Sequence, residues 1–474
     1  MEKKAPLYRQ LAKELEDQIE SGVFIPGEKL PSVRNLAQAR QISVVTILKA
    51  YQILEQKGLI HPLPKSGYYI SFHAVQSNSR AEASKRAVIP QEVHISDLIR
   101  NYTSTSKRND ETGFLGTGLS GRDIVPINQL NRIMTRELRR EDLQQLAAVR
   151  GEGYDLFRTQ LVKYLYLKEL SAAKDHLLVT NGCTEGIFIC LNVLCKPGDQ
   201  IVMQSPCSFG ILQMAETMKI RVLEVLSDDK DGLDIDHLRH ILDNYEVRAV
   251  YLNPNINNPL GTILSPEAKK KIAELVNRKK VFLIEDDVMS DLYFGTEQPV
   301  PIKAFDTDGY VIYCSSFTKT LLPTYRVGWV YSERLIDRII PVKKGINVGT
   351  PLLQQAVLAE LLESGNYSRC TRKARKIYEE RTLKLRNDML ANFPAGTRIS
   401  MPQDGYLLWT GLPSGTDAAA YYEKLRSENI FVLPGRIFSL NDRYIDHFRV
   451  NAANYSESLK PLIVKMGRMA KAYL

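Results

Sequence analysis

The stretch SSFTKTLLPTYRVGW at residues 315–329 decides the fold of the larger part of this chain. It follows an apolar, strand-like run at 310–314 and places a serine three residues before Lys319 and an arginine seven residues after it. A lysine can form a Schiff base with pyridoxal phosphate, while Ser316 and Arg326 at these spacings can share the phosphate of that cofactor. The alternative interpretation is an ordinary strand, loop and helix with one surface lysine.

Two upstream segments give this motif its context. Residues 253–261, NPNINNPLG, end one strand-like run, and residues 281–287, VFLIEDD, form another. An acidic residue at the end of a buried strand can keep a pyridine nitrogen protonated, which favours Asp286, while Asp287 is equally consistent with a solvated loop acid. Asn258 lies in an Asn-Pro-x-Gly turn that commonly has only a geometric role. Asn258 becomes a candidate cofactor contact because it precedes Asp286, Lys319 and Arg326 in an ordered series along the chain.

The ordered set resembles the fold-type I, aspartate aminotransferase-like family of pyridoxal-phosphate enzymes, class I/II branch. The resemblance implies that residues 182–184 form the phosphate loop, with the backbone N–H groups of Cys183 and Thr184 facing the anion at a helix N-terminus. It also implies that Arg449, in HFRVN, grips an α-carboxylate through its planar guanidinium group. Further segments that match the family in order are residues 151–153, 405–409 and 432–435, together with Phe438.

The first seventy residues have a different pattern. Leu11, Leu15 and Ile19 recur at helical spacing, and a second and a third helix are expected at 35–40 and 43–57. Ser43 is a suitable N-cap for the third helix. Short strands are expected at the end of this segment, at 58–60 and 66–70.

Three helices and a β-hairpin predict a winged helix-turn-helix. The segment resembles the GntR-type DNA-binding domain, in which a Pro-Ser-x-Arg motif, here PSVR at 31–34, opens the second helix. The alternative is a small helical docking module. In the first interpretation the third helix enters the major groove and the wing approaches the DNA backbone. The residues that we assign to DNA contact are Arg34, Ser43, Val44, Thr46, Lys49, Lys65 and Gly67.

One of these residues departs from the pattern of the family. Many GntR-type relatives carry an arginine directly after the capping serine, whereas this chain has Val44. An apolar side chain can contact a thymine methyl group but cannot make a bidentate contact with guanine. Residues 1–72 carry ten Lys and Arg against seven Asp and Glu, a net charge of +3, so the DNA-binding interpretation depends on the motif rather than on charge.

Composition is consistent with a large cytoplasmic protein of several domains. The chain has 474 residues, 44% of them hydrophobic, and a formal net charge of +9. Its six cysteines show no metal-type spacing and fall mostly in apolar runs, which indicates a reducing compartment rather than a disulfide framework. We expect neither a membrane span, which needs about 18 apolar residues, nor a signal peptide.

The division that follows is a DNA-binding domain at 1–72, a linker at 73–94 and an aminotransferase-like domain at 95–474. The linker is rich in Ser, Ala, Gln, Lys and Arg and has no clear periodicity. As a flexible coil, its twenty or so residues would have a reach of about 25 Å, although a segment this charged is also compatible with partial helix.

The chain joins a GntR-type DNA-binding domain to an aminotransferase-like domain. In this order of domains it resembles the MocR/GabR subfamily of bacterial regulators. The resemblance implies an α/β effector domain with a mixed, mostly parallel sheet, helices on both faces and a smaller C-terminal subdomain. It implies pyridoxal phosphate as the cofactor and a homodimer, because the cofactor sites of this fold lie at the subunit interface. A dimer carries two DNA-binding domains, so the operator should contain two half-sites.

Two departures bear on whether the cofactor site still performs chemistry. Relatives usually place a tyrosine three residues after the pyridine-binding aspartate, where this chain has Met289. They also place a stacking aromatic two residues after a proline, where Pro206 is followed by Cys207 and Ser208 with Phe209 adjacent. Without the tyrosine hydroxyl group, the bound cofactor loses a polar contact worth about 1–3 kcal/mol. Without the stacking ring, it loses an aromatic contact worth ~0.5–1.5 kcal/mol. Cofactor binding should survive, and transamination should be weak or absent.

Three functions are therefore compatible with the sequence. The first is a cofactor-dependent transcription regulator that responds to a small carboxylate-bearing effector, amino-acid-like or of the vitamin B6 type. The second is an active class I/II aminotransferase with an appended DNA-binding domain. The third is a regulator whose second domain has lost the cofactor and serves only in dimerisation.

Overall fold

The chain forms two compact units, which are described separately. A computed structural model describes residues 6–20, 24, 28–56, 59–63, 67–70, 89–103, 115–121, 123–139, 151–228, 232–402, 404–440 and 442–473. The smaller unit spans Met1–Glu82 and the larger unit spans Ala83–Leu474.

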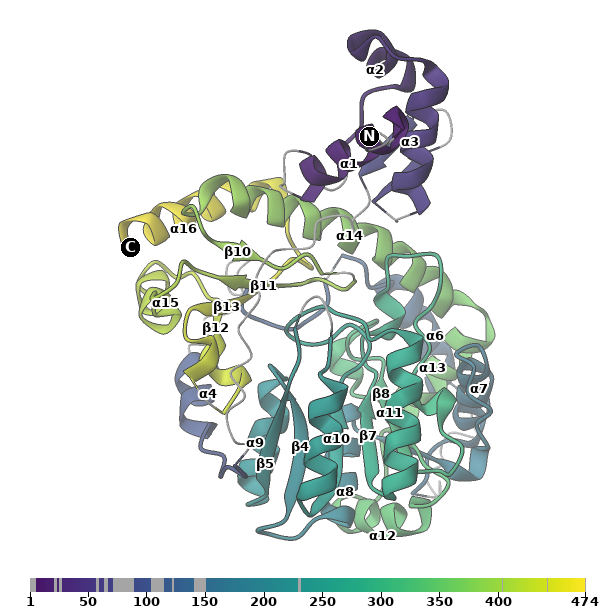
Figure 1. The fold of residues 1–474 in the computed structure, drawn as a ribbon. Coiled ribbons are helices and arrows are strands. Elements are labelled where there is room, and N and C mark those ends of the chain that lie inside the picture. The colour runs from purple at the N-terminus through teal and green to yellow at the C-terminus, as the bar shows by residue number, and fades with distance from the viewer. Residues whose placement is uncertain are drawn as a thin grey trace. The chain divides into compact units, whose positions relative to one another are not determined.

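The smaller unit is the expected winged helix. Its elements are α1 (Leu7–Glu20), α2 (Val33–Arg40), α3 (Val44–Gln56), β1 (Ile60–Leu63) and β2 (Gly67–Ile70), and the two strands pair antiparallel (Figure 1). The apolar face of α1 packs with side chains of α3 and of both strands, among them Ile47, Tyr51, Ile60 and Ile70, in one buried cluster. This burial stabilises three short helices that would be marginal in isolation.

Serine caps define where the second and third helices begin. Ser32 Oγ accepts a hydrogen bond from the backbone N–H of Asn35 at 3.2 Å, and α2 begins at Val33, two residues earlier than expected. Ser43 Oγ accepts one from the backbone N–H of Thr46 at 3.1 Å. The predicted N-cap of the third helix is therefore confirmed.

The larger unit is built on a seven-stranded sheet in the order β3-β9-β8-β7-β6-β4-β5. The strands are β3 (Leu177–Thr180), β4 (Gln200–Ser205), β5 (Arg221–Leu226), β6 (Val247–Leu252), β7 (Phe282–Asp286), β8 (Val311–Ser316) and β9 (Gly328–Tyr331). Neighbours from β8 to β5 run parallel, and β9 is antiparallel to both β8 and β3. The predicted mixed, mostly parallel sheet is confirmed.

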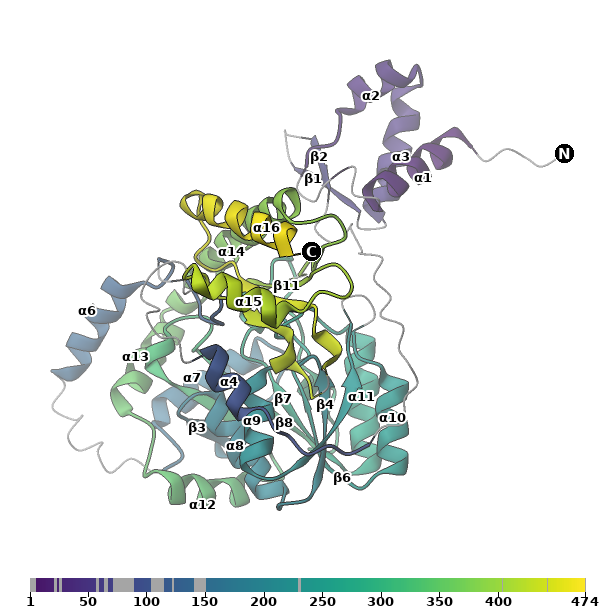
Figure 2. The same cartoon turned by 90° about the vertical axis from the view of Figure 1, so that its left-hand side faces the viewer.

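Helices cover both faces of this sheet because successive strand residues point to opposite sides. Ile284 joins the apolar cluster of α8 (Cys183–Leu194), α9 (Phe209–Thr217) and α12 (Ile336–Ile346), whereas its neighbour Leu283 joins that of α10 (Ile235–Asn244) and α11 (Pro266–Lys279). Figure 2 shows α10 and α11 on the opposite side of the sheet from α8 and α9. A further cluster packs α7 (Asp155–Tyr166) and α13 (Leu352–Glu363), with α6 (Ile127–Leu138), against β3 and β9.

The last hundred or so residues form the expected smaller subdomain. Its four-stranded antiparallel sheet has the order β10-β11-β13-β12. Its elements are α14 (Asn366–Asn392), β10 (Arg398–Ile399), β11 (Leu407–Gly411), α15 (Ala418–Ser427), β12 (Leu433–Pro434), β13 (His447–Asn451) and α16 (Lys460–Tyr473).

The expected linker at 73–94 extends too far toward the C-terminus. Gln91 exchanges backbone hydrogen bonds with Val222 at the edge of the sheet, and Val93 is buried in the core of the larger unit. Ordered packing of that unit therefore begins before residue 95, because these residues pair with an edge strand. The helix α4 (Ser96–Thr103) follows directly.

The described residues also show the state of the cysteines and the character of the helices. All six cysteines are free, and five of them are buried. No helix within the described part of the chain is both long and apolar enough to cross a membrane.

Candidate functional site

The predicted cofactor residues meet at the carboxyl ends of the central strands. Asp286 ends β7 and Ser316 ends β8, and the carboxyl ends of neighbouring parallel strands lie at one edge of a sheet. The cavity there, which we call the Lys319 cavity, has a volume of about 160 Å³. Its lining includes Cys183, Thr184, Asn258, Asp286, Ser316, Lys319 and Arg326, seven residues that sequence analysis had selected.

Lys319 is a partly buried residue whose side-chain amine holds its proton weakly for a lysine. Its Nζ donates a hydrogen bond to the backbone oxygen of Gly118 at 2.6 Å. Burial, followed by the positive charges of Arg449 and Arg326, lowers the pKa of Lys319 to about 8, against the opposing effect of Asp286. A substantial fraction of the amine is therefore neutral, and nucleophilic, near physiological pH.

Asp286 is held by neighbours on both of its carboxylate oxygens. Tyr251, on β6, donates to Oδ2 at 2.8 Å, and the Cys183 thiol donates to Oδ1 at 3.6 Å. The side chain of Asn253 donates to the backbone oxygen of Asp286 at 2.6 Å. Burial raises the pKa of Asp286 above its usual value, and the bonds from Tyr251 and Cys183 oppose that rise.

The N-terminus of α8 forms a cradle beside the cavity. Gly182 has φ +85° and precedes the first helical residue, so the free N–H groups of Cys183 and Thr184 lie at the positive end of the helix. A Cβ on Gly328 would lie 2.6 Å from the carbonyl carbon of Gly182, so only glycine allows β9 to approach this loop so closely. Arg326 donates from Nη2 to the Asn181 oxygen at 3.2 Å and lines the same cavity.

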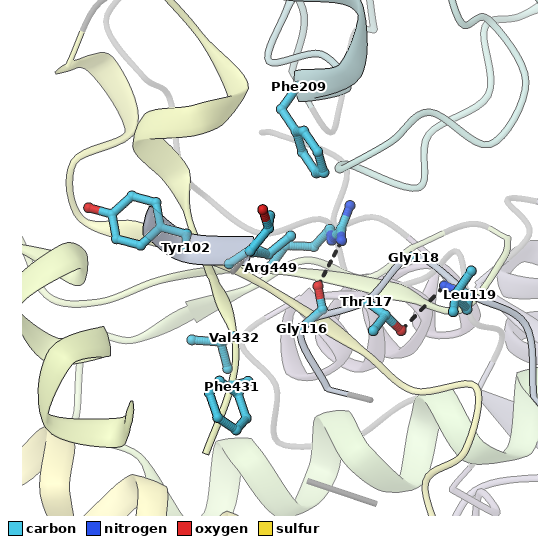
Figure 3. A pocket seen from close by; sticks show the side chains of 11 residues that line it. Tyr102, Gly116, Thr117, Gly118, Leu119, Phe209, Phe431, Val432 and Arg449 are labelled. Carbon is cyan, nitrogen blue, oxygen red and sulfur yellow. Dashed lines mark hydrogen bonds between the residues drawn. The ribbon is translucent and has the colours of Figure 1, made fainter. Parts of the chain in front are cut away.

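Arg449 lies on β13, with only 2% of its surface exposed. Nη1 donates to Asn258 Oδ1 at 2.9 Å and Nη2 donates to the backbone oxygen of Gly116 at 3.0 Å (Figure 3). Burial lowers the pKa of Arg449 to about 10, with a small opposing effect of Tyr406, so the group stays charged at neutral pH. Its buried Nε has no hydrogen-bond partner among the described residues.

The two departures noted in the sequence fall at the cavity. Met289 and Ser208 both line it, and Met289 is almost completely buried. Phe209 begins α9 and lines the adjacent pocket around Arg449 instead. The aromatic side chain that was considered as a replacement stacking partner therefore lies on the wall of a different pocket.

Sequence analysis missed a segment that covers both cationic groups. Residues 115–121, which we call the strap, place the Gly118 oxygen on Lys319 and the Gly116 oxygen on Arg449. Asn451 anchors the strap through bonds to the backbone oxygens of Thr117 and Leu119 at 3.1 and 2.9 Å. The strap contributes backbone groups, and no residue type in it signals this role.

A buried polar network around Lys168, which no sequence motif had indicated, includes residues that follow Asp286 along the chain. Lys168 Nζ lies 2.8 Å from Asp291 Oδ1, 2.7 Å from Ser290 Oγ and 3.8 Å from Asp287 Oδ2. Tyr164 and Tyr367 donate their hydroxyl groups to Asp291. Asp287 is thus a buried, bonded acid, and its interpretation as a solvated loop residue is wrong.

The predicted DNA-contacting residues of the smaller unit lie on α2, α3 and β2. Arg34 is exposed in the first turn of α2, and Val44 is 44% exposed in the first turn of α3. Lys49 Nζ lies 5.7 Å from the centre of the Tyr8 ring. The remaining predicted residues are Ser43, Thr46 and Gly67, which the structure places in the same unit, and Lys65, which lies outside the described residues.

Comparison with known families matches each unit separately. Residues 7–70 match the bacterial regulatory proteins of the gntR family. Residues 126–463 match the class I and II aminotransferases.

Individual relatives share this arrangement or its larger unit. The chain is 31% identical to the HTH-type transcriptional regulator YdcR of Escherichia coli K12 over 98% of this chain and 99% of that one. It is 26% identical to the regulator NorG of Staphylococcus aureus over 88% of this chain and 94% of NorG. Among solved structures, a multiple substrate aminotransferase of Thermococcus profundus superposes with a TM-score of 0.73 at 23% identity, covering 79% of this chain and 94% of the other.

A second solved structure, LysN, an α-aminoadipate aminotransferase of Thermus thermophilus, is 25% identical. It superposes with a TM-score of 0.71, covers 76% of this chain and 92% of its own, and was solved with N-(5'-phosphopyridoxyl)-L-leucine.

The fold and these matches define a class of protein, the DNA-binding regulators with a GntR-type winged helix and an aminotransferase-like domain. The chain belongs to this family of transcription regulators, the MocR/GabR type, along its whole length.

Proposed function

We propose that this regulator uses pyridoxal phosphate, held by Lys319, to sense a small carboxylate-bearing effector and so controls its binding to a two-half-site operator. The observation that carries the proposal is the partly buried Lys319, which has a lowered pKa and lines one cavity with Asp286, Arg326 and the N-terminus of α8. A chain that served only in dimerisation would have no need of a desolvated lysine beside a helix N-terminus.

The residues of the Lys319 cavity fit the cofactor. The α8 cradle with Arg326 suits a phosphate. Asp286 suits a protonated pyridine nitrogen, because a positive partner would offset the cost of burying the carboxylate charge. The cofactor, when bound, supplies an electrophilic carbonyl carbon and an electron-accepting ring. The LysN structure, which holds a phosphopyridoxyl adduct, supports the same assignment.

Each residue then has one task. Lys319 attaches the cofactor through Nζ after releasing the Gly118 oxygen. Tyr251 and Cys183 hold the Asp286 carboxylate in place. Arg449 binds the effector carboxylate after Nη2 releases the Gly116 oxygen, and Asn258 keeps the guanidinium group oriented.

The rate at which the cofactor-free protein takes up pyridoxal phosphate should depend on pH. The neutral amine is the reactive form, so uptake should rise about tenfold between pH 7 and 9, through the lowered pKa of Lys319 near 8. Stopped-flow absorbance measures this rate. Binding of pyridoxamine phosphate, which has no aldehyde, is the control and should not follow the same curve. A rate that stays flat or falls over this range would contradict the assignment of Lys319.

Met289→Tyr should restore a hydroxyl beside the cofactor. We expect the pH at which the visible absorption band changes to fall in the variant, because a hydroxyl donor stabilises the anionic phenolate oxygen of the cofactor. Slow half-transamination in the native protein should rise if Ser208 is not the larger defect. Near-ultraviolet circular dichroism checks for overpacking, since Met289 is buried. An unchanged titration and activity in a folded, loaded variant would place residue 289 away from the ring.

Binding to DNA is tested by selection from a random double-stranded library with the cofactor-loaded protein. We expect two half-sites, because the proposed homodimer presents two copies of α3. Analytical ultracentrifugation of the same sample should give twice the mass of the chain. Enriched sequences with a single half-site, or a monomer, would contradict this part of the proposal.

Two variants separate phosphate contact from base reading. Arg34→Ala should weaken binding to all sequences about tenfold and reduce the slope of affinity against salt, because a phosphate contact releases counterions without reading bases. Val44→Arg should instead change the preferred base at one half-site position with little loss of affinity. Fluorescence anisotropy over a salt series measures both effects. An unchanged base preference in a folded Val44→Arg protein would mean that Val44 does not face the groove.

A further inference from the structure

A second pocket opens beside the Lys319 cavity, and we call it the Arg449 pocket. It encloses about 230 Å³ between the strap, the start of α9 and the segment that leads into β12. Its lining includes Tyr102, Phe209, Phe431 and Leu433, together with Arg449. Figure 3 shows Phe209 pointing toward the guanidinium group of Arg449, with Phe431 on the other side of the pocket.

The charge that the described lining of this pocket carries is the positive charge of Arg449. Among the described residues that line it, Arg449 is the only one with a charged side chain. The two threonines of the lining are already engaged: Thr103 Oγ1 donates to the Ile99 oxygen, and Thr117 Oγ1 accepts from the Leu119 N–H. Apart from the hydroxyl group of Tyr102, the other described side chains of the lining are apolar, and none of them carries a charge that could pair with a second charge on the ligand.

Arg449 itself lacks an anionic partner. Its described hydrogen bonds go to two neutral oxygens, those of Asn258 and Gly116, while the buried Nε has no bond among the described residues. A buried guanidinium group is stabilised most by a bidentate carboxylate. A ligand carboxylate would replace the Gly116 oxygen as the acceptor for Nη2. It would also give Nε an acceptor, which the described residues do not provide.

The position of Gly118 relates this pocket to Lys319. A Cβ placed on Gly118 would lie 3.4 Å from Lys319 Nζ and 3.7 Å from the nearer nitrogens of Arg449. The side-chain nitrogens of Lys319 and Arg449 thus both lie close to Gly118 of the strap. A ligand that contacts both must carry its amino and carboxylate groups close together, and the rest of the molecule is left to the apolar walls.

From this geometry, and resting on the proposed function, we infer that the effector is an α-amino acid with an uncharged, apolar side chain. Its carboxylate lies on Arg449 in place of the Gly116 oxygen, its amino group faces Lys319, and its side chain lies against Phe209, Phe431 and Leu433. Amino acids with a second charge should bind poorly, because that charge would be buried among described side chains that offer it no charged partner.

Isothermal titration calorimetry on the full-length, cofactor-loaded protein tests this inference. The probes are L-leucine and L-phenylalanine, compared with L-glutamate and L-lysine. We expect the apolar amino acids to bind at least about 100-fold more tightly than either charged one. L-Glutamate or L-lysine binding as tightly as the apolar probes would overturn the inference.

Two variants of one position sharpen the test. Phe209→Ala should weaken L-leucine binding by roughly five- to tenfold, because an apolar wall is lost. Phe209→Arg should bring L-glutamate binding to the level of L-leucine or above by giving the second carboxylate a partner. Leu390→Ala, which removes an exposed apolar side chain on α14, is the matched control and should change neither affinity. An affinity for L-leucine that is the same in Phe209→Ala and in the native protein would remove Phe209 from the site.

Two other readouts distinguish failure of the inference from failure of the proposed function. The absorption band of the bound cofactor and binding to the selected operator are measured on the same samples. A protein with both properties that binds none of the four amino acids refutes the inference alone. A protein that takes up no cofactor refutes the proposed function, and the inference with it.

Discussion

Replacing Lys319 with alanine is expected to abolish the absorption band of bound pyridoxal phosphate and the covalent label that borohydride leaves on the native protein. Lys319 is the lysine that lines the cavity formed with Asp286 and Arg326, and burial has lowered its pKa to about 8. Without this amine the cofactor is held only by its phosphate and ring contacts, so its affinity should fall by orders of magnitude. Peptide mapping of the reduced native protein should place the label on residue 319.

The same variant should keep its fold and its binding to the operator in the absence of effector. The winged helix is a separate unit, and loss of the Lys319 bond to the Gly118 oxygen leaves the Asn451 anchors of the strap in place. Lys270→Ala, an exposed lysine of α11, is the control and should retain both band and label. A label on another lysine, or a Lys319→Ala protein that is unfolded, would contradict the role assigned here.

Lys168→Met is expected to destabilise the larger unit by about 3–5 kcal/mol, the cost of breaking a buried ion pair on one side. Lys168 is buried against Asp291 and Ser290, so its removal leaves the Asp291 carboxylate in the interior without a cation. Urea unfolding followed by tryptophan fluorescence measures the change. Both tryptophans of the chain, Trp329 and Trp409, lie in the larger unit and report on it alone.

The pH dependence of this effect has a defined sign. Burial alone would raise the pKa of Asp291, but Lys168 and the tyrosine hydroxyl groups outweigh it and lower the pKa. The stabilisation is therefore present above the unfolded-state pKa of an aspartate, about 4, and is lost as the pH falls through the lower folded-state value. The difference between native and variant proteins should narrow in acid.

Two companion variants control this measurement. Lys163→Met removes an exposed lysine of the same helix region and should change stability by no more than about 0.5 kcal/mol. Adding Asp291→Asn to Lys168→Met should recover part of the loss, because it removes the unpaired charge. Equal stability of Lys168→Met and the native protein would show that the pair contributes nothing net.

The class of this protein was predictable from its sequence because the motifs are local. Ser316, Lys319 and Arg326 lie on one strand and the loop that follows it, so their spacing along the chain largely determines their spacing in space. Asp286 lies at the end of the neighbouring parallel strand, and the carboxyl ends of neighbouring parallel strands lie at one edge of a sheet. The winged helix was predictable for the same reason, since helical periodicity and serine caps act within a few residues.

Other features were decided by tertiary structure alone. The strap acts through the backbone oxygens of Gly116 and Gly118, and glycines carry no side chain that a sequence pattern can identify. Lys168 and Asp291 meet although more than a hundred residues separate them, because the packing of α7 against the sheet brings their segments together. The sequence left open whether Phe209 faces the cofactor, and the structure places it in the lining of the other pocket, since the direction of a side chain at the start of α9 depends on how that helix packs.

The sequence by itself thus determined the family, the presence of two kinds of domain and seven of the residues that line the Lys319 cavity, because each of these depends on spacing within one element or between adjacent strands. Only the tertiary structure decided that a strap lies across Lys319 and Arg449, that Asp287 is buried in an ion network, and that an apolar pocket adjoins the arginine. These features arise from contacts between segments distant in the chain, and such contacts are selected by complementarity of packed surfaces, which no local pattern of residues encodes.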